Sequence, residues 1–272
     1  MKKVIVTTVI GLCLLISCKE IKKANPEIDS DPLPSTDSSV PKPVDDVQED
    51  PITIIPIEHA TAVIEWRNIT IYIDPVGGAT KFEGQKKPDL ILITDIHGDH
   101  FDLTTLEELD TEKSKIIMPS ALASRMPEVF TPQIDVLENG ASKLRFGINV
   151  EAIPMYNLRE EAKKFHEKGR GNGYVLNMGE KRLYFSGDTE DIPEMRALKD
   201  IDMAFVCMNQ PYTMTVEKAA DAVLEFEPKQ VYPYHYRGRP DVSDVGKFKM
   251  LIEEDGPGIE VVQLDWYPED EF

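Results

Sequence analysis

Four side chains that can bind a metal ion stand within residues 95–100, whose sequence is Asp-Ile-His-Gly-Asp-His. The segment follows the apolar run Leu90 to Ile93, which is typical of a short buried strand, and Gly98 allows the backbone to turn sharply. Imidazole nitrogens and carboxylate oxygens together suit zinc, iron or manganese. A solvated acidic turn would not explain two histidines beside two aspartates, so the segment predicts a metal site. The predicted ligands are Asp95, His97, Asp99 and His100.

The segment from Thr94 to His100 resembles the Thr-His-x-His-x-Asp-His signature of the metallo-β-lactamase superfamily, with Asp95 in place of the first histidine. Two downstream motifs extend the resemblance. Gly187-Asp188-Thr189 follows a predicted strand and resembles the family's Gly-Asp-Thr, whose aspartate bridges two metals. His235 ends a later predicted strand and resembles the family's final histidine ligand. The resemblance implies an α/β fold, the αββα four-layer sandwich of this superfamily.

The resemblance also implies one or two divalent metal ions as cofactors. A first position would be formed by residues that match the family throughout: Asp99, His100, Asp188 and His235. A second position would share Asp188 and add His97, with Asp95 in place of a histidine. We expect zinc, although the extra negative charge of Asp95 would favour a harder ion such as manganese or iron.

The remaining ligand of the second position is left open by the sequence. Asn157, in Pro154-Met155-Tyr156-Asn157, stands where many members of the superfamily place a metal-binding histidine. Asparagine is a weak, neutral ligand, and it is also a common turn residue. His166 lies in a polar, charged segment, which argues against a core histidine. The alternatives for His166 are a replacement ligand, a proton shuttle or a substrate contact.

Three further residues stand near these motifs, and two of them, Asp74 and Tyr236, have two interpretations each. Asp74 precedes Pro75, and it is either a turn residue or, as often in the family, the support of a ligating histidine. His59 is expected to be a structural histidine of a strand. Tyr236 follows His235, and it would either donate a hydrogen bond to a substrate or pack in the wall of the site.

The reaction that the resemblance implies is metal-assisted hydrolysis, with Asp99 and Asp188 as the catalytic residues. Asp99 would orient the nucleophile or accept its proton. Pro-x-Tyr-Asn and Gly-Asp-Thr-Glu, at 154–157 and 187–190, are similar to motifs of the lactonase-like and phospholipase-D-like branch. This similarity implies a small-molecule ester, lactone or phosphodiester as substrate.

Two other functions are compatible with the sequence. One is a phosphodiesterase that acts on lipid or nucleotide debris. The other is an envelope binding protein on a degenerate, non-catalytic scaffold, because Asp95 and Asn157 depart from the usual ligands. A phosphodiesterase would act on bis-nitrophenyl phosphate and not on lactones, which distinguishes the first alternative from the ester or lactone hydrolase. A binding protein would retain metal weakly and show no turnover.

The elements that must position these residues alternate between strands and helices, which predicts layered α/β packing. A mobile loop is expected at residues 169–173, which contain three glycines. Ser120 is a plausible N-cap of its helix. The predicted helices are 103–109, 120–125, a helix opening at 191–195, 215–225 and 242–253. The predicted strands are 52–57, 62–66, 70–73, 90–93, 115–119, 134–137, 142–146, 149–153, 182–186, 203–208, 230–236 and 259–264.

The amino terminus has the pattern of an export signal. Two lysines precede an apolar stretch, Val4 to Ile16, which is short for a membrane-spanning helix. The stretch ends in Leu-Ile-Ser-Cys18, which resembles a bacterial lipobox; an ordinary secretory leader is the alternative. We therefore predict a signal peptide at 1–17, an acylated Cys18 with a disordered acidic tether at 18–51, and a hydrolase domain at 52–272. This organisation predicts a membrane-anchored lipoprotein of the bacterial cell envelope.

Composition excludes some classes of protein. The chain of 272 residues carries a formal net charge of −19, which argues against nucleic acid as a partner. Its three cysteines are Cys13 and Cys18 at the amino terminus and Cys207 in a predicted buried strand. No internal disulfide framework is therefore expected.

Overall fold

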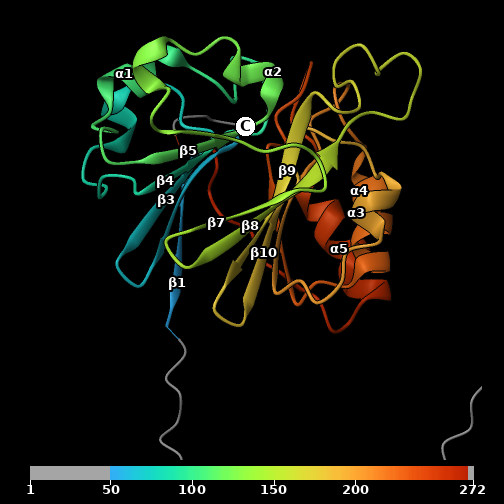
Figure 1. Ribbon diagram of the computed structural model, residues 1–272. Coiled ribbons are helices and arrows are strands. Elements are labelled where there is room, and N and C mark those ends of the chain that lie inside the picture. Colours follow the sequence, from blue (N-terminus) through green and yellow to red (C-terminus); the bar gives the residue numbers. More distant parts are fainter. Residues whose placement is uncertain (1–49, 269–272) are drawn as a thin grey trace, which may run out of the picture. The chain divides into compact units, whose positions relative to one another are not determined.

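The computed structural model describes residues 50–268, which form two mixed β-sheets packed face to face with helices on both outer faces (Figure 1). This arrangement confirms the predicted αββα sandwich. The predicted signal peptide, Cys18 and nearly all of the predicted tether lie outside the described residues. Within residues 50–268, no helix is both long enough and apolar enough to cross a membrane.

The first sheet has six strands in chain order: β1 (Ile52–Glu58), β2 (Thr61–Trp66), β3 (Ile69–Ile73), β4 (Leu90–Leu92), β5 (Lys115–Met118) and β6 (Ile134–Val136). β1, β2 and β3 pair in antiparallel fashion, whereas β3 to β6 run parallel. Parallel neighbours need crossover connections. Those after β4 and β5 carry the short helices α1 (Leu103–Glu108) and α2 (Ser120–Ala123), and 3₁₀ turns form at Ala79–Phe82 and Glu128–Phe130.

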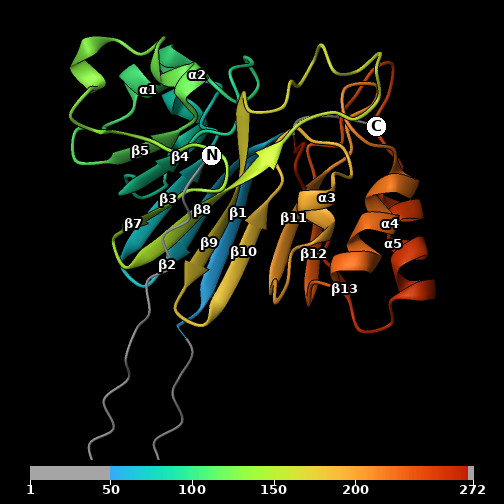
Figure 2. The same ribbon diagram turned by 45° about the vertical axis from the view of Figure 1, so that its right-hand side comes forward.

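The second sheet has seven strands: β7 (Ser142–Arg145), β8 (Ile148–Met155), β9 (Gly171–Met178), β10 (Lys181–Phe185), β11 (Met203–Cys207), β12 (Gln230–Tyr234) and β13 (Glu260–Val261). Their order across the sheet is β13-β12-β11-β10-β9-β8-β7. β7 to β10 pair in antiparallel fashion, whereas β10 to β13 run parallel. Three helices cover its outer face (Figure 2): α3 (Pro193–Arg196), α4 (Val216–Phe226) and α5 (Val245–Asp255).

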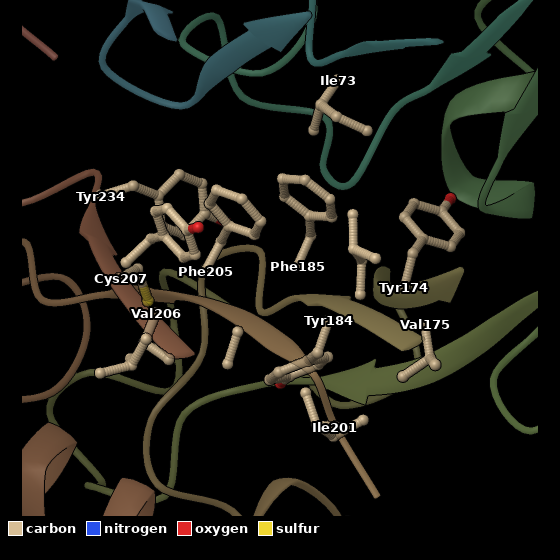
Figure 3. Close-up of a cluster of buried hydrophobic side chains, with 14 of the residues drawn as sticks. Ile73, Tyr174, Val175, Tyr184, Phe185, Ile201, Phe205, Val206, Cys207 and Tyr234 are labelled. Carbon is tan, nitrogen blue, oxygen red and sulfur yellow. The ribbon is translucent and has the colours of Figure 1, made fainter. Parts of the chain in front are cut away.

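The main hydrophobic core fills the space between the two sheets and continues between the second sheet and α3, α4 and α5. Successive side chains of a strand point to opposite faces, and the second sheet obeys this rule. Figure 3 shows Phe185, Phe205 and Tyr234 on the face toward Ile73 of the first sheet, while Tyr184 points to the other face. The rings of Phe185 and Phe205 stack with centroids 4.2 Å apart. A second, smaller core lies between the first sheet and α1 and α2.

Cys207 is fully buried in the main core. Burial raises the pKa of its thiol to about 12. This agrees with its predicted role in core packing, because a neutral, buried thiol is unreactive.

The parallel strands determine where a site can form. β4 ends shortly before residue 95, β10 ends before Asp188, and β12 ends directly before His235. In sheets of parallel strands, ligands bind beyond the carboxyl ends of the strands. The three sequence motifs therefore stand at strand ends that can face one common site.

Two sequence-based expectations about local structure are wrong. Residues 171–173 belong to β9 and are not part of a mobile loop, because the glycines allow close packing there. A Cβ at Gly171 would lie 2.9 Å from the carbonyl oxygen of Thr94, and a Cβ at Gly173 would lie 2.8 Å from that of Ser186. Ser120 does not cap α2: Pro119 occupies the N-cap position, and no side chain accepts a hydrogen bond there.

Candidate metal centre

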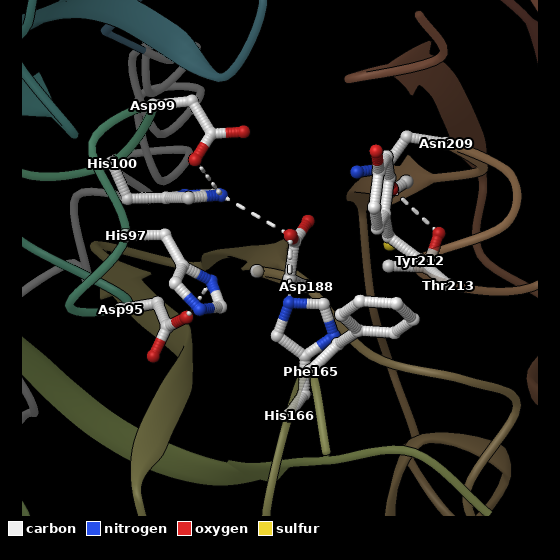
Figure 4. Close-up of polar contacts among 12 residues, drawn as sticks. Asp95, His97, Asp99, His100, Phe165, His166, Asp188, Asn209, Tyr212 and Thr213 are labelled. Carbon is white, nitrogen blue, oxygen red and sulfur yellow. Dashed lines mark hydrogen bonds and ion pairs between the residues drawn. The ribbon is translucent and has the colours of Figure 1, made fainter. Parts of the chain in front are cut away.

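Asp99, His100, Asp188 and His235 meet beyond the carboxyl ends of β4, β10 and β12. Nε2 of His235 lies 2.9 Å from Oδ1 of Asp188, and Nε2 of His100 lies 3.4 Å from Oδ2 of the same carboxylate. Asp99 completes the group, with oxygens 3.9 Å from Nε2 of His100 and 3.7 Å from Nε2 of His235. We call these four residues the first cluster; Figure 4 shows Asp99, His100 and Asp188 facing one another.

The donor atoms of the first cluster fit a divalent ion. Nε2 of His100 and Nε2 of His235 face each other at 3.1 Å, a distance that two lone pairs would not favour unless a metal ion or a proton lay between them. Oδ1 of Asp188 is buried and, within the described residues, accepts no hydrogen bond. Two imidazoles and two carboxylates are ligands that zinc and other divalent metals accept.

Asp74 holds His100 from behind. Its Oδ2 lies 2.8 Å from Nδ1 of His100, and its two oxygens also accept hydrogen bonds from the backbone and side chain of Thr94. A hydrogen bond from Nδ1–H to Asp74 leaves the lone pair of Nε2 free for a metal. Of the two interpretations that the sequence allowed for Asp74, the geometry therefore agrees with support of a ligating histidine.

A second cluster contains Asp95, His97 and His166. Nδ1 of His97 lies 2.8 Å from Oδ2 of Asp95. His166 reaches the first cluster as well, since its Nε2 lies 3.0 Å from Oδ2 of Asp188. Asp188 consequently stands between the two clusters (Figure 4), as the resemblance implied for a bridging aspartate.

The structure brings His166 into the second cluster and holds Asn157 by hydrogen bonds of its amide nitrogen and its backbone. The amide nitrogen of Asn157 donates to the carbonyl oxygens of Ala162 and Tyr212, at 3.0 and 2.6 Å. Its backbone N–H donates to the carbonyl oxygen of His166 at 3.0 Å. These contacts hold the segment that carries His166, whereas Oδ1 of Asn157 is buried and accepts no hydrogen bond within the described residues, so a role of Asn157 as a ligand stays a prediction.

His59 lies in the turn between β1 and β2, and not in a strand as predicted, and its ring reaches the first cluster. Its ring centroid lies 3.9 Å from that of His235, and its Nε2 lies 3.5 Å from Oδ2 of Asp99. Its Nδ1 lies 2.7 Å from the hydroxyl of Tyr267. Burial and the neighbouring His235 lower the pKa of His59 to about 4. His59 is therefore neutral at neutral pH and helps to hold the wall of the first cluster.

Tyr236 packs against Tyr267, with ring centroids 4.8 Å apart. This agrees with wall packing, the second of its two interpretations. The neighbouring Tyr234 is buried, and its hydroxyl accepts a hydrogen bond from the N–H of Gly187 at 3.0 Å. Tyr234 therefore fixes the turn that presents Asp188.

Three residues of the site have backbone angles that L-amino acids rarely adopt. The φ angles of His59, Asp74 and His235 are 58°, 44° and 47°. Such conformations are strained and persist only where the surrounding structure enforces them. Their concentration at one place is typical of a functional site.

Electrostatics agree with a metal-binding centre. Burial lowers the pKa of His100, but Asp188, Asp99 and Asp74 outweigh it and raise this pKa well above 6.5. Burial raises the pKa of Asp188, but His235, His100 and His166 outweigh it and lower this pKa well below its usual range. Without a metal, protons thus take the place of the cation, and metal binding releases them.

Two neighbours of the clusters were not predicted from the sequence. Nδ2 of Asn209 lies 3.3 Å from Nε2 of His235, and its Oδ1 accepts a hydrogen bond from the Thr213 hydroxyl at 2.6 Å. Arg170 donates from Nε and Nη2 to the two oxygens of Asp95, at 3.1 and 2.8 Å. No local sequence pattern indicated Arg170, because its position beside Asp95 depends on how β9 packs against the metal loop.

Comparison with known proteins supports these observations. The Beta-lactamase superfamily domain matches residues 53–235 of the chain. The UPF0173 metal-dependent hydrolase PH1671 of Pyrococcus horikoshii is 30% identical over 217 residues, which cover 76% of this chain and 93% of the relative.

Solved structures are similar to this fold. A protein of Parabacteroides distasonis, described as a metal-dependent hydrolase, is 36% identical with a TM-score of 0.71, over 79% of this chain and 94% of that chain. The metallo-beta-lactamase fold protein YhfI of Bacillus subtilis has a TM-score of 0.62 at 9% identity, over 79% of this chain and 97% of that chain. The second similarity concerns the fold alone.

Proposed function

The chain belongs to the metallo-β-lactamase superfamily and is a metal-dependent hydrolase, and from this premise we propose that it cleaves an ester, lactone or phosphodiester bond in a small molecule. The observation that carries the proposal is the position of Asp188 between two clusters of metal-binding side chains. Pro-x-Tyr-Asn at 154–157 and Gly-Asp-Thr-Glu at 187–190 support the choice of bond, because they are similar to motifs of the lactonase-like and phospholipase-D-like branch.

The first cluster is the principal site for the ion, and zinc is the ion that we propose for it. A divalent ion bound there would polarise the oxygen of the bond under attack and lower the pKa of its bound water to about 7. His97, His166 and Asp95 would hold a second ion, with Asp188 shared between the two positions.

Asp99 is the residue that we propose to accept the proton of the attacking water. Its side chain is 43% exposed, whereas that of Asp188 is 3% exposed, so Asp99 is the carboxylate that water and substrate can reach. Burial raises the pKa of Asp99, but His100 and His59 outweigh it and lower this pKa. The carboxylate is therefore ionised at neutral pH, as a general base must be.

Asn209 is suited to orient the substrate. The hydrogen bond from Thr213 to Oδ1 of Asn209 turns Nδ2 toward His235 and the first cluster. An N–H donor in this place would donate to the oxygen on which negative charge develops during attack. Because Asn209 is buried and already hydrogen-bonded, this donor is fixed before the substrate arrives.

The test combines metal analysis with a substrate screen. Full-length protein purified without chelator is analysed by elemental mass spectrometry and assayed on nitrophenyl esters, lactones and bis-nitrophenyl phosphate. We expect bound metal and turnover of at least one class, with both lost in Asp188→Asn. Tightly bound metal without turnover of any of the three classes would contradict the proposed bond.

The two alternatives predict different outcomes of the same screen. A phosphodiesterase would hydrolyse bis-nitrophenyl phosphate and leave lactones intact. A binding protein on a degenerate scaffold would retain metal weakly and show no turnover. The meeting of Asp99, His100, Asp188 and His235 in one cluster does not favour this second alternative.

We further propose that the protein is a lipoprotein of the bacterial cell envelope, anchored through an acyl-modified Cys18 and acting outside the cytoplasm. The support is the sequence of residues 2–18, with two lysines, an apolar stretch and the lipobox-like Leu-Ile-Ser-Cys. Several acyl chains would hold the protein stably to a bilayer. A small molecule, and not a nucleic acid, is the proposed substrate in this location.

A further inference from the structure

Asp95 is the one residue of the Thr94–His100 segment that departs from the family signature, and it is bound to an arginine. Its side chain is fully buried, and the guanidinium of Arg170 contacts both of its oxygens. Arg170 is itself only 17% exposed. Arginine stays protonated in proteins, and its planar fork matches a carboxylate in this two-point manner.

The approach of Arg170 is built into the fold. It precedes Gly171, whose backbone packs so tightly on the metal loop that a Cβ would lie 3.3 Å from Oδ1 of Asp95. The N–H of Asn172 donates to the carbonyl oxygen of Thr94 at 2.9 Å. Arg170 also donates to the carbonyl oxygen of Phe165, next to His166. The guanidinium is therefore held beside two residues of the second cluster.

This geometry places a permanent positive charge directly against Asp95, one of the side chains that would hold a second metal ion. The carboxylates of the two clusters are Asp95, Asp99 and Asp188. One divalent ion in the first cluster together with Arg170 balances these three negative charges. A second divalent ion would add charge that the ligands do not compensate, and it would compete with Arg170 for the oxygens of Asp95.

We propose that Arg170 is an internal countercation for Asp95 that keeps the second metal position weak, so that the enzyme holds one ion tightly and a second only at high metal concentration. The proposal rests on the proposed function, since it takes the first cluster to be the principal metal site. It assigns Arg170 two effects as a positioning residue: its guanidinium occupies the oxygens of Asp95, and its positive charge directly opposes a second cation.

The experiment measures zinc binding and does not depend on turnover. Full-length protein is stripped with chelator and dialysed against buffers of fixed free zinc, and the equivalents bound are counted by elemental mass spectrometry. Arg170→Gln is compared with wild type and with Arg170→Lys, which keeps the charge. Arg159→Gln is the matched control, because Arg159 pairs with the buried Glu190, which belongs to neither cluster.

We expect Arg170→Gln to bind the second equivalent at least about tenfold more tightly, with the first unchanged. Mutation of a residue that supports a metal ligand typically lowers metal affinity 10–100-fold; the effect of Arg170→Gln should have a similar size but the opposite sign, because Arg170 opposes the second ion. Arg170→Lys and Arg159→Gln should bind zinc as wild type does. Equal or weaker binding of the second equivalent in Arg170→Gln would overturn the proposal, and so would two equally tight equivalents in wild type. A wild type that binds no zinc would instead refute the proposed function.

Arg170→Gln leaves the carboxylate of Asp95 buried without its positive partner, which can prevent folding. The comparison is therefore repeated in proteins in which Asp95 is replaced by asparagine. Asp95→Asn and the double variant Asp95→Asn with Arg170→Gln differ only in the arginine. The double variant should bind the second equivalent more tightly than the single one. An unchanged or weaker second equivalent in this pair would overturn the proposal independently.

Discussion

At the scale of single residues, Asp188 is the side chain on which both clusters depend. It lies within 3.4 Å of His100, His166 and His235, and no other carboxylate contacts all three among residues 50–268. We expect Asp188→Asn to lose tightly bound metal and activity together. Asp202→Asn is the matched control, since Asp202 is also buried but pairs with Lys229. Elemental analysis measures the metal content of both variants, and tightly bound metal in Asp188→Asn would contradict the prediction.

Asp74 acts on the metal through His100, so its replacement tests the support of that ligand. Asparagine keeps the size of Asp74 but weakens the hydrogen bond that fixes the His100 ring. We expect Asp74→Asn to reduce metal affinity by about 10–100-fold. Asp135→Asn, which removes a carboxylate paired with Arg145, should leave metal affinity unchanged. Zinc titration measures both, and equal affinities in the two variants would contradict a role of Asp74.

At the scale of elements, the contact between β9 and the metal loop connects the two sheets at the site. Gly171 makes this contact possible, because any larger residue would meet Cε of Met155 at 2.3 Å and the carbonyl oxygen of Thr94 at 2.9 Å. The same contact sets the position of Arg170 beside Asp95. Residues 171–173, for which the sequence predicts a mobile loop, are therefore a closely packed part of β9 that positions Arg170 at the site.

A single methyl group at Gly171 tests this contact. Gly171→Ala should destabilise the protein by about 1–3 kcal/mol, the usual cost of inserting a methyl group into a packed interior. Gly258→Ala is the control, since a Cβ there meets nothing within 4 Å. Chemical denaturation of both variants measures the difference. A Gly171→Ala protein as stable as the control would show that the contact is loose.

At the scale of the whole molecule, metal and protons compete for the same buried centre. The carboxylates that surround His100 raise its pKa above 6.5 despite its burial. A group whose pKa is raised on folding stabilises the folded chain below its unfolded pKa, and this contribution disappears as pH rises through the folded value. Metal-free protein should therefore lose stability as pH rises above 6.5, whereas the loaded protein keeps it.

Melting temperatures with and without chelator measure this effect. We expect the difference in melting temperature between metal-loaded and metal-free protein to widen from about pH 6 to about pH 8. At the higher pH the metal-free protein loses the stabilising proton of His100, whereas in the loaded protein the ion takes its place. The His235→Ala variant should show a much smaller gap at both values. A gap that narrows as pH rises would contradict the prediction.

The proposed anchor also concerns the whole molecule, and it depends on one atom, the sulfur of Cys18. Full-length protein expressed in a bacterial host should incorporate labelled fatty acid and sediment with membranes. Cys18→Ser should do neither, whereas Cys13→Ser should behave as wild type, because Cys13 lies within the predicted leader. Membrane association of Cys18→Ser would favour an anchor of another kind.

The sequence by itself determined the family, the layered α/β fold and the residues of the first cluster. These were readable because strand periodicity, turn residues and metal ligands are local patterns, each complete within about ten residues. The structure brought Asp99, His100, Asp188 and His235 together at the strand ends where those patterns placed them.

Only the tertiary structure placed His166 beside Asp188 and revealed Arg170 and Asn209. His166 comes from a segment without regular secondary structure, and its position depends on hydrogen bonds from Asn157 and Arg170 that no local pattern encodes. Arg170 and Asp95 are 75 residues apart in the chain. Contacts of this kind form only when the two sheets pack against each other. A local sequence pattern therefore cannot predict them, because they depend on the whole fold.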